Sequence, residues 1–211
     1  MRIVIFGAAG RIGSRILDEA LARGHTVTAV LRDVARLELA HPGLVKVTAD
    51  AADSSAVAQV ATGQAAAISA IGPGSVGDVS VIVAVARALI AGLPRAGVRR
   101  LLVVGGAGTL EIRPGVQRID TQEYPEIYRP SGYAQKESLA LYRASGLDWS
   151  YLSPPVIIEP GARSGRYRIG ADQVLADEAG RSRISMEDYA VAVLDEIETP
   201  RHLQRRFTVA D

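Results

Sequence analysis

Three glycines near the start of the chain restrict its fold more than any other feature. They lie in the segment GAAGRIG, from Gly7 to Gly13, which has the pattern GxxGxxG. An apolar run at 3–6, typical of a buried strand, precedes the segment, and apolar residues at helical spacing follow it over 11–23. In that context the glycines allow backbone N–H groups and the helix N-terminus to approach a pyrophosphate closely. The turn therefore predicts a dinucleotide site rather than an ordinary strand–helix connection.

Strands and helices are predicted to alternate along most of the chain. The expected strands are 3–6, 26–31, 45–48, 66–70, 101–104 and 149–152, and the expected helices are 11–23, 54–60, 79–93 and 131–144. This order predicts an α/β fold, a Rossmann-type doubly wound parallel sheet with helices on both faces. Residues 109–130 show no period and contain three prolines, so we expect a long loop there with room for one short element.

The last part of the chain does not follow this alternation of strands and helices. We expect a short strand at 166–170, a helix from Met186 to Ile197 capped by Ser185, and a final strand at 206–209. No linker, repeat or low-complexity segment interrupts the sequence. The prediction is one NAD(P)-binding domain over 1–211, with 154–211 adding a small substrate-side extension at the carboxyl edge of the sheet.

Composition argues against several classes of function. The 24 basic and 23 acidic residues leave a formal net charge of +1, whereas a nucleic-acid binder usually carries a basic excess. There is no cysteine, and the three histidines lie far apart, so we expect neither a metal site nor a thiol nucleophile. The longest apolar stretch is shorter than the ~20 residues of a membrane span. We expect a cytoplasmic monomer or homodimer without a nucleic-acid or membrane partner.

The end of the second strand bears on the choice of dinucleotide. NAD-binding proteins place an acidic residue there to hold the ribose hydroxyls. Here Arg32 takes that position, and a guanidinium suits the 2′-phosphate of NADP. Arg36 would share a helical face with Arg32 if the stretch is helical, and Arg11 could add a third charge. NADPH is therefore preferred over NADH. The alternative is that both arginines at 32 and 36 are solvated and Asp33 contacts the ribose instead of capping a short helix.

Two aspartates follow the third strand. The carboxylate of Asp50 can accept a hydrogen bond from the adenine amino group, although a turn or capping role is equally open. Asp53 fits the N-cap of the next helix.

The motifs GAAGRIG, GGAGTLE, WSYLSPP and SMEDYAVA follow one another in an order that is more specific than the glycine turn alone. Together they resemble the atypical short-chain dehydrogenase/reductases, in the NAD(P)H-binding branch that includes NADPH-flavin reductases and biliverdin-IXβ reductases. The resemblance covers nearly the whole chain. The resemblance implies that the cofactor lies across the strand ends. Its adenine half would contact three groups of residues: the phosphates would lie at Gly7, Ala9, Gly10, Arg11 and Ile12, the 2′-phosphate at Arg32 and Arg36, and the adenine at Asp50 and Ala51. In the other half, the ribose would lie along Ala70, Ile71 and Gly72, and the nicotinamide near Gly105 and Gly106, with Ser153, Pro154 and Pro155 closing that side.

The catalytic residues are less clearly marked. Short-chain dehydrogenases that act on alcohols use a Tyr-x-x-x-Lys pair, in which the lysine lowers the pKa of the tyrosine. Tyr133 and Lys136 are the candidates here, but they are three residues apart instead of four, and the branch resembled generally lacks this pair. Reduction of a planar acceptor depends mainly on holding that acceptor against the nicotinamide at hydride-transfer distance, and the protons can come from water.

An aromatic or otherwise conjugated acceptor would then lie over the glycine pair at 105–106. Tyr124, Tyr128, Tyr133 and Tyr167 are the aromatic residues available to stack on it, whereas Trp149 and Tyr151 are expected in the core.

These features predict an NADPH-dependent oxidoreductase that transfers hydride to a flavin, a quinone or a similar conjugated acceptor. FMN or FAD would then be a substrate and not a prosthetic group. Two alternatives remain: a non-catalytic NADP-sensing regulator like the NmrA-type proteins, and a carbonyl reductase or isomerase that acts on a polyketide or sugar through Tyr133.

Overall fold

The computed structural model describes residues 1–72 and 77–211. Its centre is an eight-stranded sheet in the order β10-β12-β8-β5-β4-β1-β2-β3, in which every pairing is parallel except that of β10 with β12. The strands are β1 (Arg2–Phe6), β2 (Thr26–Leu31), β3 (Leu44–Thr48), β4 (Ala66–Ser69), β5 (Arg100–Val104), β8 (Asp148–Ser153), β10 (Arg168–Gly170) and β12 (Arg205–Ala210). The predicted Rossmann-type α/β fold is confirmed.

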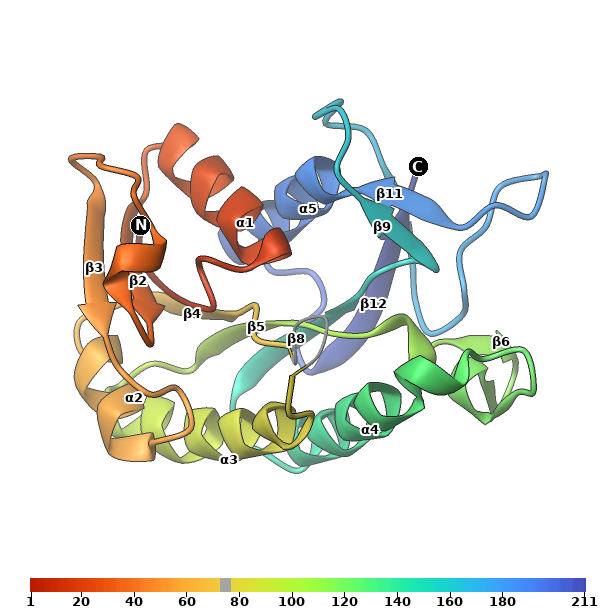
Figure 1. Ribbon diagram of the computed structural model, residues 1–211, viewed down its shortest axis with the longest axis horizontal. Coiled ribbons are helices and arrows are strands. Elements are labelled where there is room, and N and C mark those ends of the chain that lie inside the picture. The colour runs from red at the N-terminus through yellow and green to blue at the C-terminus, as the bar shows by residue number, and fades with distance from the viewer. Residues whose placement is uncertain (73–76) are drawn as a thin grey trace.

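Helices cover both faces of the sheet (Figure 1). They are α1 (Arg11–Ala22), α2 (Ser54–Ala61), α3 (Ser80–Arg95), α4 (Arg129–Arg143) and α5 (Met186–Glu198). Side chains alternate along each strand, so Ile3 and Ile5 of β1 join the core under α1 and α5, whereas Val4 and Phe6 join the core under α2, α3 and α4. A strand buried on both faces is apolar throughout, which explains the unbroken apolar runs in the sequence.

Local signals in the sequence position several of these elements. Asp53 caps the N-terminus of α2, where its carboxylate accepts a hydrogen bond from the Ser55 N–H (2.8 Å). Ser185 caps α5 in the same way, because its hydroxyl accepts a hydrogen bond from the Asp188 N–H (2.9 Å). Gly24 ends α1 in the left-handed conformation with φ +78°. These capping predictions are confirmed.

The segment at 109–130 is more structured than expected. It holds the antiparallel ladder of β6 (Glu111–Arg113) with β7 (Val116–Gln117), as well as 3-10 turns at Arg118–Asp120 and Glu126–Tyr128. α4 also begins at Arg129, two residues before the expected start, because Pro130 suits the first turn of a helix. Expecting only one short element was wrong, since pairs of two- and three-residue strands leave no period to detect.

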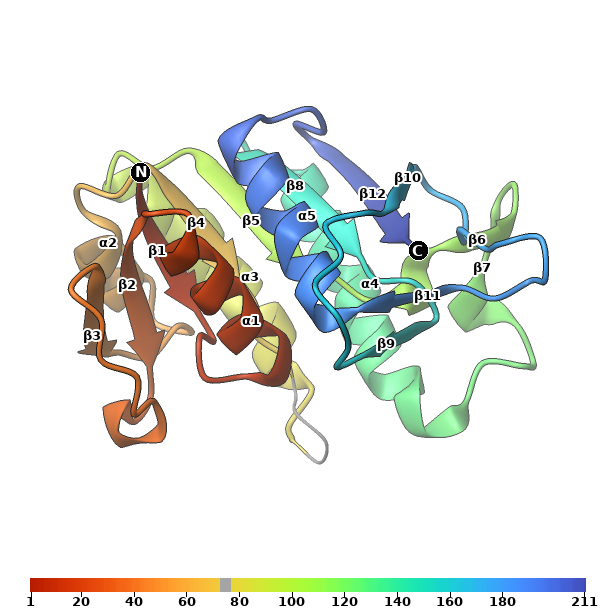
Figure 2. The ribbon, with the colours of Figure 1, turned by 90° about the horizontal axis from the view of Figure 1, so that it is seen from above.

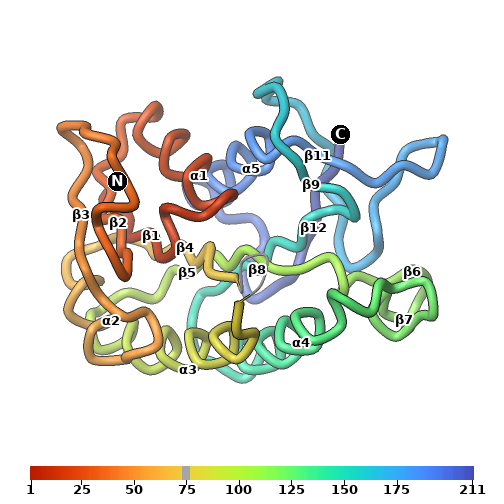
Figure 3. The backbone as a smooth tube through the Cα atoms, in the orientation of Figure 1, coloured from red at the N-terminus to blue at the C-terminus, as the bar shows by residue number. Residues whose placement is uncertain are grey.

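The last third of the chain is divided between the main sheet and a separate ladder. α5 packs beside α1, and β12 extends the sheet beyond β8. The parallel ladder of β9 (Ile157–Glu159) with β11 (Arg183–Ser185) was not predicted and lies outside the main sheet (Figure 3). None of the described helices combines the length and apolar character needed to span a bilayer.

Candidate functional site

The glycine turn after β1 is closely packed, and a hydrogen bond from the Gly10 N–H to the Gly7 carbonyl (3.0 Å) closes it. Gly7 has φ +86°, and a Cβ built on it would lie 2.8 Å from the carbonyl oxygen of Ala70. A Cβ on Gly13 would overlap the carbonyl oxygen of Gly7. Gly10 is the N-cap of α1 without a side-chain cap, and the first helical hydrogen bond runs from the Ser14 N–H to the Gly10 carbonyl (2.9 Å). The N–H groups of the first turn, which includes Arg11 and Ile12, therefore have no intrahelical acceptor.

The end of β4 lies beside this turn, as a doubly wound sheet requires. The Ala70 N–H donates to the Phe6 carbonyl (2.9 Å), so Ala70 and Ile71 continue directly alongside the glycine turn. Gly72 is exposed at the edge of the described residues, and the neighbouring Pro73 and Gly74 of the same expected loop lie outside them. The carboxyl ends of β1, β2 and β3 lie side by side along the edge of the sheet at which α1 begins (Figure 2).

Arg32 and Arg36 are both exposed near the end of β2, and neither guanidinium forms a hydrogen bond or ion pair with the described part of the chain. The expectation of a shared helical face is wrong, because the only helical turn here is a 3-10 turn at Val34–Arg36. The Asp33 carboxylate caps that turn by accepting from the Ala35 N–H (3.0 Å). One Asp50 oxygen accepts from the Ala52 N–H (2.9 Å), which leaves the second oxygen of this exposed carboxylate unpaired in the described structure. The side chain of Ala51 is buried beside it.

The predicted nicotinamide end lies at the carboxyl ends of β5 and β8. The Gly105 N–H donates to the Leu152 carbonyl (2.8 Å), and the ring of Tyr151 fills the space that a Cβ of Gly105 would need. A Cβ on Gly106 would lie 3.2 Å from Cγ of Gln135 on α4. Thus both glycines are required by close packing, and their backbone closes this end of the strand edge.

Residues 7–200 match the NAD(P)H-binding family. The chain belongs to this family. A relative from Bacillus subtilis, the uncharacterized protein YwnB, is 38% identical over 99% of this chain and 98% of its own. A solved structure from Bacteroides thetaiotaomicron, named as a putative epimerase, is 41% identical over 99% of this chain and 96% of that one, with a TM-score of 0.92. One from Streptococcus pneumoniae, named as a putative NADH-flavin reductase, is 29% identical over 100% and 99% of the two chains, with a TM-score of 0.85.

Membership in the NAD(P)H-binding family confirms the predicted family and the class of cofactor. The choice between NADPH and NADH, and the role of each site residue, stay predictions. The geometry brings the predicted residues together at one edge of the sheet in two groups, the glycine turn with the ends of β2 to β4 and the ends of β5 and β8.

Two residues at the predicted nicotinamide end, Gln135 and Thr109, could not be foreseen from the sequence. Gln135 accepts a hydrogen bond from the Tyr151 hydroxyl, both through its carbonyl (3.2 Å) and through its side chain. The Thr109 hydroxyl donates to the Gly106 carbonyl (3.1 Å) and lies 3.4 Å from the hydroxyl of buried Ser153. Pro154 and Pro155, which follow, are buried as well. No local signal marks Gln135 or Thr109, because their roles depend on contacts between distant parts of the chain.

The Tyr133 and Lys136 side chains are not arranged as a catalytic pair. The Lys136 ammonium lies 3.1 Å from a carboxylate oxygen of Asp120. The Tyr133 side chain is half-exposed, and its hydroxyl forms no hydrogen bond within the described residues. The Lys136 ammonium is therefore not placed to lower the pKa of the Tyr133 hydroxyl, as proton donation by a tyrosine requires.

The four tyrosines expected to stack on an acceptor divide into two pairs. Tyr124 is buried beneath the Arg118 guanidinium, which lies 5.0 Å from its ring centre, and the Tyr167 hydroxyl donates to Asp195 on α5. The buried Tyr124 ring is not available, so for Tyr124 the expectation is wrong. The Tyr167 ring is half-buried against the core under α1 and α5, and its stacking on an acceptor stays a prediction. Tyr128 and Tyr133 remain exposed at the start of α4. The core positions of Trp149 and Tyr151 are confirmed.

Proposed function

We propose that this chain is an NADPH-dependent oxidoreductase that reduces a flavin, a quinone or a similar conjugated acceptor. The observation that carries the proposal is the turn at Gly7 to Gly13, where the N–H groups that begin α1 have no intrahelical acceptor and where a Cβ on Gly7 or Gly13 would meet neighbouring backbone. Such a turn fits a pyrophosphate, since the donors and the helix N-terminus both favour an anion. When bound, the nicotinamide supplies the hydride.

The preference for NADPH rests on Arg32 and Arg36. Both guanidiniums are exposed at the end of β2 and have no partner in the described structure, so they are available to a 2′-phosphate. Asp33, the residue that would otherwise hold the ribose hydroxyls, uses one carboxylate oxygen for the Ala35 N–H. This arrangement supports NADPH over NADH.

The surroundings of the nicotinamide end support a planar acceptor. Exposed apolar side chains occur in the two segments that follow β5 and β8, in the 3-10 turn before α4, in the first turns of α4 and directly after β8: Ile127, Tyr128, Tyr133, Val156 and Ile157. Exposed apolar side chains of this kind favour an apolar ligand. Gly105 and Gly106 are half-buried here, with the Tyr151 ring and the Gln135 side chain packed where their Cβ atoms would lie, so these two residues add no side chain of their own against the rings. Because Tyr133 and Lys136 do not form a proton-donating pair, the main contribution of the chain to the reaction is to position the acceptor against the nicotinamide.

A steady-state assay tests the proposal. The loss of NADPH absorbance is followed with FMN, a quinone and a panel of ketones. We expect turnover with FMN or the quinone and none with the ketones. Turnover with ketones alone, abolished in Tyr133→Phe, would instead support a carbonyl reductase. Tight NADPH binding without turnover of any acceptor would support the regulatory alternative.

A second candidate function is an isomerase, because the relative named as a putative epimerase is 41% identical and matches almost the whole chain. An epimerase regenerates its cofactor in each cycle. It would therefore exchange solvent deuterium into a sugar substrate or invert a centre without net NADPH loss, which distinguishes it from a reductase.

A further inference from the structure

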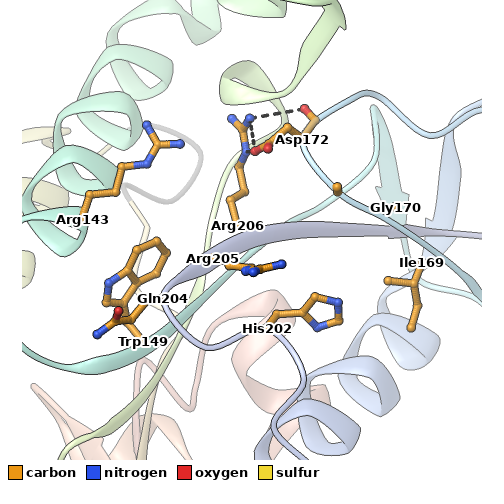
Figure 4. A pocket seen from close by; sticks show the side chains of 10 residues that line it. Arg143, Trp149, Ile169, Gly170, Asp172, His202, Gln204, Arg205 and Arg206 are labelled. Atoms are coloured by element: carbon orange, nitrogen blue, oxygen red, sulfur yellow. Dashed lines mark hydrogen bonds and ion pairs between the residues drawn. The ribbon is translucent and has the colours of Figure 1, made fainter.

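A second hollow lies away from the glycine turn, at the amino ends of β8 and β12. Its volume is about 540 Å³. It is lined by the end of α4, the first residues of β8 and β12, and the segment that follows β10 (Figure 4). A volume of this size is within the range of small-molecule sites. Of the residues that line it, Arg206 contacts the candidate cofactor site, because its guanidinium donates a hydrogen bond to the Thr109 carbonyl.

Positive charge is concentrated in this hollow. Three arginines, Arg143, Arg205 and Arg206, line it together with one carboxylate, that of Asp172. The Arg206 guanidinium is 1% exposed and binds Asp172 (Nε to Oδ1, 2.8 Å). The side chains of Arg143 and Arg205 are exposed, and neither guanidinium forms a hydrogen bond or ion pair with the residues that the structure describes. His202, also in the wall, is paired with Glu196 (2.8 Å).

The backbone at the wall of the hollow is strained. Gln204 has φ +54° and is the single residue other than glycine with a positive φ in the described ranges. Its N–H donates to the Trp149 carbonyl (2.6 Å), and its side-chain amide donates to the Leu147 carbonyl (3.4 Å). A left-handed conformation costs a residue other than glycine about 1 kcal/mol or more and is found most often at ligand sites. This turn positions Arg205 directly after it.

We propose that the hollow binds a small metabolite through a phosphate or carboxylate group held by Arg143 and Arg205. Guanidinium groups bind both kinds of oxyanion through paired N–H donors. The two arginines come from different elements, α4 and β12, and both line the same hollow (Figure 4). An anion between them would receive donors from two sides, and Asp172 is neutralised by Arg206 and does not repel it. The site is independent of the cofactor turn.

The single tryptophan of the chain provides the test. Trp149 lines the hollow, so its fluorescence reports occupancy there and not at the glycine turn. Inorganic phosphate and citrate are titrated at constant ionic strength, with chloride as the matched salt. We expect a saturable fluorescence change with phosphate, citrate or both. A response to phosphate alone assigns a phosphorylated ligand, and a response to citrate alone assigns a carboxylated one.

Variants identify the groups that bind. We expect Arg143→Ala and Arg205→Ala each to weaken the response about five- to tenfold, since each loses charged hydrogen bonds. Both side chains are exposed, and far-UV circular dichroism checks that the variants fold. Arg95→Ala, an exposed arginine at the end of α3, is the matched control, and Arg32→Ala excludes a contribution from the cofactor site. The proposal is overturned by equal responses to chloride, by no saturable response, or by unchanged affinity in both variants.

Discussion

At the scale of single residues, several positions of the candidate cofactor site are determined by backbone proximity. Gly13 contacts the turn at Gly7, Gly105 contacts the ring of Tyr151, and Gly106 contacts Gln135. The glycines could be predicted because a strand–turn–helix pattern reveals them locally. Their contact partners could not, because Tyr151 and Gln135 come from elements far along the chain. For the same reason Tyr124 was expected at the acceptor and instead is engaged with Arg118.

Gly13→Ala should damage both stability and cofactor binding. The new Cβ would overlap the Gly7 carbonyl oxygen, so the turn must move away from α1. We expect a loss of about 1–3 kcal/mol in the free energy of unfolding and at least about a tenfold weaker affinity for NADPH. Urea unfolding and calorimetric titration measure the two effects. Gly146→Ala is the control, because its Cβ would meet no atom within 4 Å; an equal loss there would contradict the steric explanation.

Arg32→Ala should affect the two dinucleotides unequally. The guanidinium would bind only the 2′-phosphate, so we expect the Kd for NADPH to rise about tenfold or more, as the loss of a charged hydrogen-bond pair implies. The Kd for NADH should change less than about twofold. Both constants are obtained from fluorescence of the reduced nicotinamide. If the affinities for NADPH and NADH fall together, Arg32 does not select the phosphate.

At the scale of elements, ion pairs attach the long segment after β9 to α1. The Glu19 side chain is 6% exposed and accepts hydrogen bonds from Arg163 (2.7 and 2.8 Å) and from Arg23 (2.7 Å). Arg23 in turn binds Asp195 and Glu198 of α5. Thus α1, α5 and the 160–167 segment are connected through one carboxylate. Helices and long strands could be predicted from periodicity, but a connection of this kind depends on tertiary packing and leaves no pattern in the sequence.

This connection should make stability depend on pH in the acid range. The hydrogen bond from Arg163 lowers the pKa of Glu19 to about 2, from an ordinary value of 4.5, against the opposing effect of burial. Because the pKa is lower in the folded state, the stabilisation is complete above about pH 5 and is lost as the pH falls towards 2. Since Arg163 is half-exposed, we expect Glu19→Gln to cost only about 1–2 kcal/mol at pH 7.

The measurement is urea unfolding of both proteins between pH 7 and pH 2. The difference in unfolding free energy should shrink as the pH falls. Asp18→Asn, an exposed neighbour without a described ion pair, is the control. A difference that is constant over the whole range would show that Glu19 does not carry this pH dependence.

At the scale of the whole molecule, one sheet joins two groups of candidate ligand-binding residues. The glycine turn and Arg32 belong to β1 and β2, and the predicted nicotinamide end belongs to β5 and β8. A dinucleotide that spans both groups would contact strands from both halves of the sheet. The parallel sheet that holds these strands could be predicted from the alternation of elements, and a short strand was expected at 166–170, where β10 lies. The antiparallel pairing of β10 and the small ladders could not be predicted, because they depend on contacts of three residues or fewer.

Cofactor binding should therefore stabilise the entire molecule in one cooperative transition. Ligand at about a hundred times its Kd adds about 2.7 kcal/mol to the unfolding free energy. For a chain of this size that corresponds to a rise in Tm of about 5 °C or more. Differential scanning calorimetry with NADPH, NADH and adenosine alone measures the effect. A split transition, in which only part of the heat moves with NADPH, would mean that the ligand contacts one half of the sheet.

The two small ladders have a consequence for how such a protein can diversify. β6 with β7, and β9 with β11, are paired outside the eight-stranded sheet. They belong to the chain segments that follow β5 and β8, whose carboxyl ends form the predicted nicotinamide end, whereas the glycine turn lies between β1 and α1 within the main sheet and its helices. Insertions or exchanges in these ladders can therefore reshape the acceptor side without altering the register of the central strands. The same glycine turn and central sheet could in this way serve many different reactions.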